Sequence, residues 1–181
     1  DHERQGDVKW TLTGDHNVRN ALSAIAAARH VGILPSDAIA ALAQFQSVKR
    51  RMEVVASKEN VTIYDDFAHH PTAIAATLHG LREQVGEARI IAIVEPRSNT
   101  MRLGVHQHTL AASLRAADIA IIYQPESQSA LTLAANTVVC QTIPDIVARF
   151  RSEKGRGGHV VLMSNGSFSG LQGRLIDELN S

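Results

Sequence analysis

Two acidic residues and two histidines stand together in the segment YDDFAHHP, residues 64–71. Side chains of these types could bind a metal, relay a proton, or line the polar mouth of a strand-to-helix turn. Pro71 suits the first position of a helix, so His70 should fall at or next to the N-cap. Unpaired backbone N–H groups and the helix dipole attract anions there, so the segment favours a phosphate or carboxylate partner over a cation.

A metal site is the less favoured interpretation of this segment. Neighbouring side chains such as His69 and His70 usually point apart, and no further cluster of His or Cys lies nearby in the sequence. We therefore predict no metal ligand here. For this stretch taken alone, a solvated turn before a proline-started helix is the simple alternative.

Two further polar segments could contact an anionic ligand. Lys49, Arg50 and Arg51 form a basic triplet, and guanidinium groups bind phosphate oxygens through paired hydrogen bonds. The segment PRSNTMR offers cationic, hydroxyl and amide donors suited to a carboxylate-bearing ligand. These donors belong to Arg97, Ser98, Asn99, Thr100 and Arg102. The alternatives are a solvated basic run and an ordinary polar loop.

Two glycine-containing segments give weaker signals. SNGSFSG, residues 164–170, resembles a glycine-rich anion-binding loop before a helix, but it lacks the G-x-x-x-x-G-K-[ST] form. GDHNVRN, residues 14–20, places Asn17 and Asn20 three positions apart at a helix start, where they can share one face. Asn17 could instead cap that helix.

The elements that position these segments follow from apolar periodicity. Runs of Val and Ile predict strands at 52–56, 61–65, 89–94, 118–123, 137–141 and 159–163. Helical periodicity predicts helices at 71–85, 105–116, 144–153 and 170–179. This alternation is typical of an α/β fold with a doubly wound, mostly parallel sheet of about six strands and flanking helices. Ligands of such sheets bind at the carboxyl ends of the strands, where three of the polar segments fall.

The first 47 residues follow a different pattern. Val8, Trp10 and Leu12 alternate like a short strand, and two helical patterns follow, the second opening at Pro35. The periodicity lapses over residues 46–50, which form a candidate domain boundary.

Composition limits the class of partner. Eighteen Lys and Arg balance eighteen Asp and Glu among 181 residues, so no net field favours nucleic acid or an anionic membrane. Cys140 is the single cysteine, which fits a reducing compartment. The sequence shows no signal peptide and no apolar run of about 18 residues. We expect a cytoplasmic protein that contacts neither nucleic acid nor membrane.

Several segments together resemble the Mur ligases, ATP-dependent enzymes that form amide bonds in bacterial cell-wall synthesis. GDHNVRNALSAIAAA is similar to the family segment G-x-H-N-x-x-N-x-x-A-A, VKRRME to R-R-F-E, and YDDFAHHPTAIAATL to D-D-Y-x-H-H-P-T-E-I. The resemblance implies a Rossmann-like C-terminal domain at 48–181, preceded at 1–47 by the tail of a central ATP-binding domain. Both parts would then work with the rest of a longer ligase chain, which would include an N-terminal domain and a phosphate loop.

Within the family, EPRSNTMRLG and VVLMSNGSFSGLQGRL are most similar to members that join a murein tripeptide to UDP-N-acetylmuramate. The tripeptide is L-alanyl-γ-D-glutamyl-meso-diaminopimelate. This similarity implies an enzyme of peptidoglycan recycling that uses ATP and Mg²⁺, with metal ligands mainly outside this chain, so the chain alone should be inactive. An L-alanine-adding ligase, or a noncatalytic Rossmann-type module that binds a nucleotide or peptide, is the alternative.

The resemblance also implies a reaction in which ATP converts the muramyl carboxylate to an acyl phosphate. It assigns roles in that reaction to individual residues. Catalytic roles are implied for Arg51, Asp66 and His70. Nucleotide contacts are implied for His16, Asn17, Asn20, Arg51, Asp66 and His69. Substrate contacts are implied for His70, Arg97, Ser98, Asn99, Thr100, Arg102, Ser164, Asn165 and Gly166.

Three positions depart from the family pattern. Ala73 stands where relatives carry glutamate, and Ser167 and Ser169 stand where glycine is expected. We assign no role to these three side chains.

Overall fold

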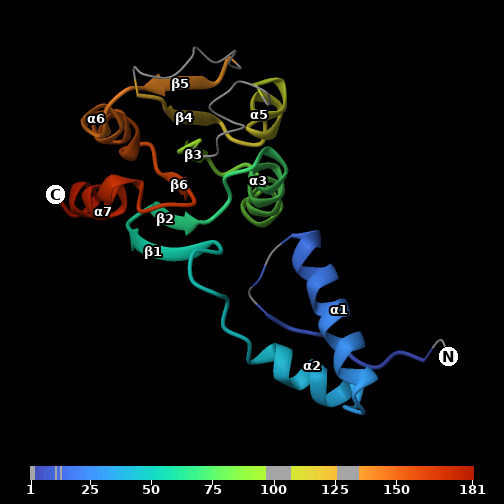
Figure 1. Cartoon of the computed structure of the whole chain (residues 1–181). Helices are drawn as coiled ribbons and strands as arrows, with labels where there is room; N and C mark the ends of the chain where they lie inside the picture. The colour runs from blue at the N-terminus through green and yellow to red at the C-terminus, as the bar shows by residue number, and fades with distance from the viewer. Residues whose placement is uncertain (1–2, 11, 13, 97–106, 126–134) are drawn as a thin grey trace. The chain divides into compact units, whose positions relative to one another are not determined.

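The computed structural model describes residues 3–10, 12, 14–96, 107–125 and 135–181 (Figure 1). The chain divides into two compact units, Asp1–Val48 and Lys49–Ser181. The predicted substrate residues Arg97, Ser98, Asn99, Thr100 and Arg102 lie outside the described residues. None of the described helices is both long and apolar enough to cross a membrane.

The first unit contains two helices, α1 (Asp15–His30) and α2 (Pro35–Ala43), as the periodicity predicts. The predicted strand around Val8 and Trp10 is wrong, because residues 3–10 carry no strand. A strand needs a neighbour for its backbone N–H and C=O groups, and no described residue of this unit supplies one.

Apolar side chains of this first unit are poorly covered. Among its described residues only Ala21 is a buried apolar residue, whereas Leu22 and Leu34 are each 63% exposed and Val31 is 73% exposed. Two short helices cannot by themselves bury enough apolar surface to offset the entropy of ordering them. This unit therefore exposes several large apolar side chains.

The second unit is built on a six-stranded sheet with the order β1-β2-β6-β3-β4-β5. Its strands are β1 (Glu53–Lys58), β2 (Val61–Asp66), β3 (Ile90–Val94), β4 (Ile119–Tyr123), β5 (Thr137–Cys140) and β6 (Gly158–Met163). Only β1 runs antiparallel to its neighbour; the other pairs are parallel. Each strand lies within two residues of its predicted bounds, so the predicted α/β class is confirmed.

Helices cover both faces of this sheet, which is what makes it doubly wound (Figure 1). Helices α3 (Pro71–Val85) and α5 (Gln107–Ser113) lie on one face. Helices α6 (Ile143–Lys154) and α7 (Leu171–Asn180) lie on the other, with a short 3₁₀ turn, η1 (Phe168–Gly170), before α7. Helix α5 ends three residues before its predicted end, because the backbone tightens into a turn after Ser113.

Alternate residues of each central strand serve these two apolar clusters. On β3, Ile90, Ala92 and Val94 face the cluster under α3 and α5, whereas Ile91 and Ile93 face the cluster under α6 and α7. Because both faces are covered, both sets must be apolar. This explains the continuous apolar runs in the sequence.

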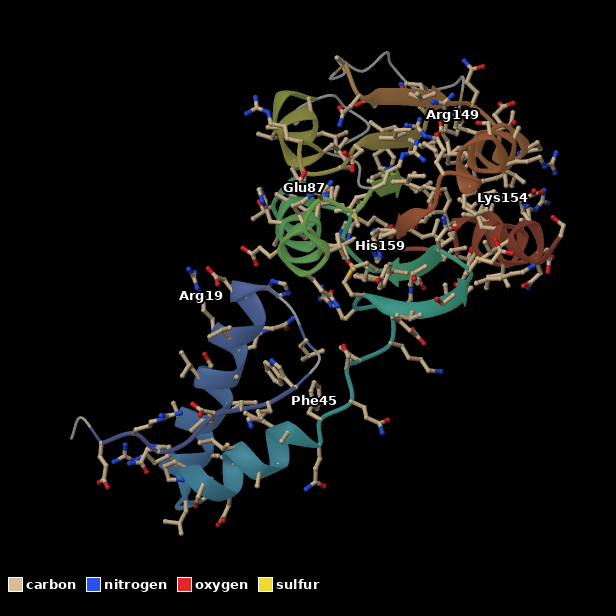
Figure 2. All side chains as sticks on the ribbon, turned by 180° about the vertical axis from the view of Figure 1, so that it is seen from behind. Arg19, Phe45, Glu87, Arg149, Lys154 and His159 are labelled. Carbon is tan, nitrogen blue, oxygen red and sulfur yellow. The ribbon has the colours of Figure 1, made fainter. Side chains whose placement is uncertain are left out.

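The buried carboxylate of Glu178 on α7 forms ion pairs with two basic residues of α6. Arg151 Nη2 lies 2.6 Å from Glu178 Oε2, and Lys154 Nζ lies 3.0 Å from Glu178 Oε1. Lys154 projects from α6 in Figure 2. Hydrogen bonding by the Arg151 guanidinium is the main cause that lowers the pKa of Glu178 to about 2. The ion pairs therefore tie α7 to α6.

We predict that Glu178→Gln changes how stability depends on pH. The folded-state pKa of about 2 lies below the ordinary value of 4.5, so this carboxylate stabilises the fold above pH 4.5 and loses that effect as the pH falls toward 2. The variant should have a lower Tm at neutral pH and a shallower decline of Tm between those two values. Thermal unfolding followed by circular dichroism at each pH measures both.

The matched control is Glu83→Gln, which changes an exposed carboxylate on α3. Its Tm should follow that of the unchanged protein at every pH. Parallel Tm curves for Glu178→Gln and the unchanged protein would show that the α6–α7 ion pairs do not contribute.

Candidate functional site

Three strands end at the same level on one edge of the sheet. In the parallel register, Asp66 of β2 and Val94 of β3 both pair with Met163 of β6. The backbone continues the ladder one step further, since Ser164 N donates to Asp66 O at 3.2 Å and Glu95 N donates to Met163 O at 3.0 Å. This carboxyl edge is where the sequence predicted a ligand site, and it brings the segments after β2 and β6 together.

The carboxylate of Asp66 is buried and bonded to three parts of the protein. Its Oδ2 accepts from Met52 N at 2.9 Å, and its Oδ1 accepts from Ala68 N at 2.8 Å and from Thr77 Oγ1 at 3.3 Å. Only 2% of the residue is exposed. These bonds fix the start of β1, the turn after β2 and the middle of α3, so Asp66 organises the edge from within. Its contact with a nucleotide stays a prediction.

Asp65, the neighbour of Asp66, pairs with an arginine that the sequence argument did not select. Arg50 Nε lies 3.1 Å from Asp65 Oδ2, and Arg50 Nη2 donates to Ser164 O at 2.5 Å. Its guanidinium carbon also lies 5.3 Å from the centre of the Phe67 ring. Burial raises the pKa of Asp65, although the Arg50 charge opposes that shift. The basic triplet was the only sequence signal for Arg50.

The two histidines have different hydrogen-bonding roles. His70 is the N-cap of α3 as predicted, and its Nδ1 accepts from Thr72 N at 3.4 Å. His69 Nδ1 lies 2.9 Å from Phe67 O, and because a carbonyl oxygen only accepts, this nitrogen must carry the proton. The rings are thus held by separate backbone atoms. The described residues contain no group of three His, Cys, Asp or Glu placed to hold a metal.

Glu95, a buried acidic residue directly after β3, is hydrogen-bonded to Ser164, directly after β6. Ser164 Oγ donates to Glu95 Oε2 at 2.5 Å and accepts from Gly166 N at 3.0 Å. Glu95 is 7% exposed and Ser164 is 1% exposed. This pair shapes the start of the predicted Ser164–Asn165–Gly166 pocket. Sequence reasoning missed Glu95, although an acidic residue directly after a buried apolar strand is a usable signal.

The structure describes all three positions that depart from the family pattern. Ser169 has φ 49°, in the left-handed region that favours glycine, whereas Ser167 has φ −76°, which any residue adopts. Ala73 occupies the third position of α3 and packs partly buried against the core. A glutamate there could reach back to the N-cap backbone, so Ala73 lacks one possible capping bond.

The remaining predicted residues are divided between the two units. Arg51 is exposed and sits at the start of the second unit. In the first unit, His16 and Asn20 are exposed on α1 and Asn17 is half-buried. The proposal that Asn17 caps α1 is wrong: Gly14 is the N-cap, and among the described residues no side-chain capping bond is found at this end.

A family model described as Mur ligase, glutamate ligase domain, matches residues 50–166. The chain therefore belongs to the Mur ligase family. The match includes the whole carboxyl edge described above.

Individual relatives show which members of the family this chain is similar to. UDP-N-acetylmuramate–L-alanyl-γ-D-glutamyl-meso-2,6-diaminoheptandioate ligase of Escherichia coli K12 is 46% identical, over 99% of this chain and 41% of its own. The crystal structure of a murein peptide ligase from Psychrobacter arcticus 273-4 is 38% identical with a TM-score of 0.73, covering 96% of this chain and 39% of its own. UDP-N-acetylmuramate–L-alanine ligase of Ruegeria pomeroyi is 51% identical, but over only 47% of this chain and 18% of its own. The chain thus spans about two fifths of the first two relatives.

We predict that Asp66→Asn destabilises the second unit. The amide keeps the shape but places an NH₂ group against donors that the carboxylate accepted, and each charge-assisted hydrogen bond is worth about 1.5–3 kcal/mol. We expect a loss of unfolding free energy in that range, measured by urea denaturation. Asp65→Asn is the matched control, because it makes the same change one residue earlier, where the carboxylate bonds the Arg50 guanidinium. Equal losses for the two variants would contradict the central role of Asp66.

Proposed function

We propose that the chain is the C-terminal part of an ATP-dependent ligase. The ligase joins L-alanyl-γ-D-glutamyl-meso-diaminopimelate to UDP-N-acetylmuramate in the cytoplasm, as a step of peptidoglycan recycling. The observation that carries this proposal is the 46% identity to the Escherichia coli ligase of that substrate over 99% of the chain. The quoted L-alanine-adding relative supports the alternative less, because its similarity extends over less than half of the chain.

In this proposal residues 1–47 are the tail of the central ATP-binding domain and residues 48–181 form the C-terminal domain. The exposed apolar side chains of the first unit support the division, since they need further protein surface. The sequence contains no G-x-x-x-x-G-K-[ST] phosphate loop, so we expect no ATP turnover by this chain alone. The rest of the ligase would supply that loop and the N-terminal domain.

The chemistry would proceed through an acyl phosphate. The muramyl carboxylate takes the γ-phosphoryl group of ATP and ADP leaves; the tripeptide amine then attacks the acyl carbon, and the tetrahedral intermediate loses a proton and inorganic phosphate to give the amide. Negative charge develops on the transferring phosphoryl group, where a fixed guanidinium is most useful. Arg51 is exposed at the start of the second unit and fits that role. The described residues contain no group of three His, Cys, Asp or Glu placed to hold a metal, and we propose that the ligands of Mg²⁺ lie mainly in the rest of the ligase.

The other residues divide into nucleotide and substrate contacts. For the nucleotide we propose the polar start of α1, with His16, Asn17 and Asn20, together with His69 and Asp66. His70 would face the muramyl substrate from the start of α3. The incoming peptide would meet Arg97, Ser98, Asn99, Thr100 and Arg102, with Ser164, Asn165 and Gly166 completing its pocket.

The activity is tested with the full-length ligase, using UDP-N-acetylmuramate and ATP with either the tripeptide or L-alanine as acceptor. Phosphate release and amide product should appear with the tripeptide and be much weaker with L-alanine. The isolated 181-residue chain should give neither product. Preference for L-alanine would favour the alternative ligase, and ATP binding without product would favour a noncatalytic module.

A second prediction concerns Arg51 in the full-length ligase. Arg51→Ala removes a charge-assisted phosphate contact worth about 1.5–3 kcal/mol, so kcat/KM for ATP should fall about ten- to a hundredfold. Lys49→Ala is the matched control, because it removes an exposed positive charge two residues away. Steady-state kinetics with ATP varied at saturating peptide measure both variants. Equal kinetics for Arg51→Ala and Lys49→Ala would indicate that the triplet is only a solvated basic run.

A further inference from the structure

The turn before β1 holds Arg51 between two strained residues. Arg50 has φ 59° and Met52 has φ 50°, both in the left-handed region that side chains other than glycine rarely adopt. Such conformations persist only where surrounding contacts hold them, and they gather at functional sites. The contacts that hold this turn therefore bear on what Arg51 does.

Backbone groups on both sides of Arg51 are fixed by the second unit. Arg50 N donates to Glu53 Oε2 at 2.9 Å, and Arg50 O accepts from Phe67 N at 2.8 Å. On the other side, Met52 N donates to Asp66 Oδ2 at 2.9 Å. The turn is thus bonded to β1, to the segment after β2 and to the buried carboxylate at the carboxyl edge.

The Arg50 side chain adds a second set of contacts. Its guanidinium bonds Asp65 Oδ2 and Ser164 O, from the ends of β2 and β6, and lies over the Phe67 ring. Because its charge already faces the Asp65 carboxylate, Arg50 is poorly suited to bind a ligand phosphate itself. It links the basic triplet to two of the other polar segments that the sequence singled out.

We propose that Arg50 is a positioning residue that presents the Arg51 guanidinium to the phosphates of ATP. This inference rests on the proposed function of Arg51. By bonding the ends of two strands, Arg50 fixes the backbone from which Arg51 projects. The side chain of Arg51 then loses less conformational freedom when the phosphate binds, and the developing charge meets a donor already in place. Arg50 acts through Arg51 and touches no reacting atom.

A double-mutant cycle in the full-length ligase tests this proposal. Arg50→Ala should lower kcat/KM for ATP about tenfold or more. The double variant Arg50→Ala/Arg51→Ala should be no worse than Arg51→Ala alone, because the positioning effect needs the positioned side chain. Arg50→Lys keeps the charge and can reach one of the two acceptors, so it should recover part of the loss.

Arg82→Ala is the matched control for stability. The Arg82 side chain is 27% exposed, close to the 29% of Arg50, and it also joins loops, by bonding Asp118 and the Ala88 and Ala116 carbonyls. These partners flank the starts of β3 and β4, at the opposite edge of the sheet. At temperatures where every variant is folded by circular dichroism, Arg82→Ala should leave kcat/KM for ATP within about twofold of the unchanged ligase.

A structural measurement on the 181-residue chain complements the kinetics. Arg50→Ala should speed hydrogen exchange at the Met52 and Phe67 amides relative to those of β3, while Arg82→Ala should not. The proposal is overturned if Arg50→Ala leaves ATP kinetics unchanged while Arg51→Ala impairs them, or if the two losses multiply in the double variant. Unchanged kinetics for Arg51→Ala as well would sink the proposed phosphate contact together with this inference.

Discussion

The buried carboxylate of Asp66 is the constraint on which the carboxyl edge depends. A charge that is 2% exposed is costly to remove from water unless donors surround it, and here they come from the turn before β1, the turn after β2 and the middle of α3. Each of these segments must keep its place for the carboxylate to be satisfied. The strained turn around Arg51, the turn after β2 and the middle of α3 are thus tied to one residue. The Glu95–Ser164 pair plays a similar part between β3 and β6.

The sheet could be predicted from the sequence because its signal is local. Strands covered on both faces must be apolar at consecutive positions, and the runs at 90–94 and 119–123 have that form. The position of β6 between β2 and β3 has no such local signal, since it depends on packing between distant segments. The predicted strand near Trp10 is wrong because a strand also depends on a distant segment. Alternation of apolar and polar residues describes a strand but does not supply its hydrogen-bonding neighbour.

The candidate site was partly predictable because its place follows from the predicted strands. The rule that ligands bind at the carboxyl ends of parallel strands placed residues 64–71 and 164–166 together, and the register of β2, β6 and β3 does so. Composition could not divide the roles of adjacent arginines. Arg50 turns its guanidinium toward Asp65 whereas Arg51 is exposed, a difference set by backbone angles and long-range partners. Family resemblance supplied the nucleotide and substrate roles, which no local pattern gives.

The place of β6 has a consequence for how this domain is made. During synthesis β1 to β5 leave the ribosome before β6. Because β6 lies between β2 and β3 in the sheet, the groups β1–β2 and β3–β4–β5 cannot be joined until β6 has been made. Until then β2 and β3 each present an unpaired inner edge, the kind of surface that pairs with other chains, and every side chain of β3 is Ile, Ala or Val. Cooperative folding of the sheet is thus a late event in translation. Chaperones that shield extended apolar edges should accordingly engage nascent chains that have passed β5 but not yet released β6.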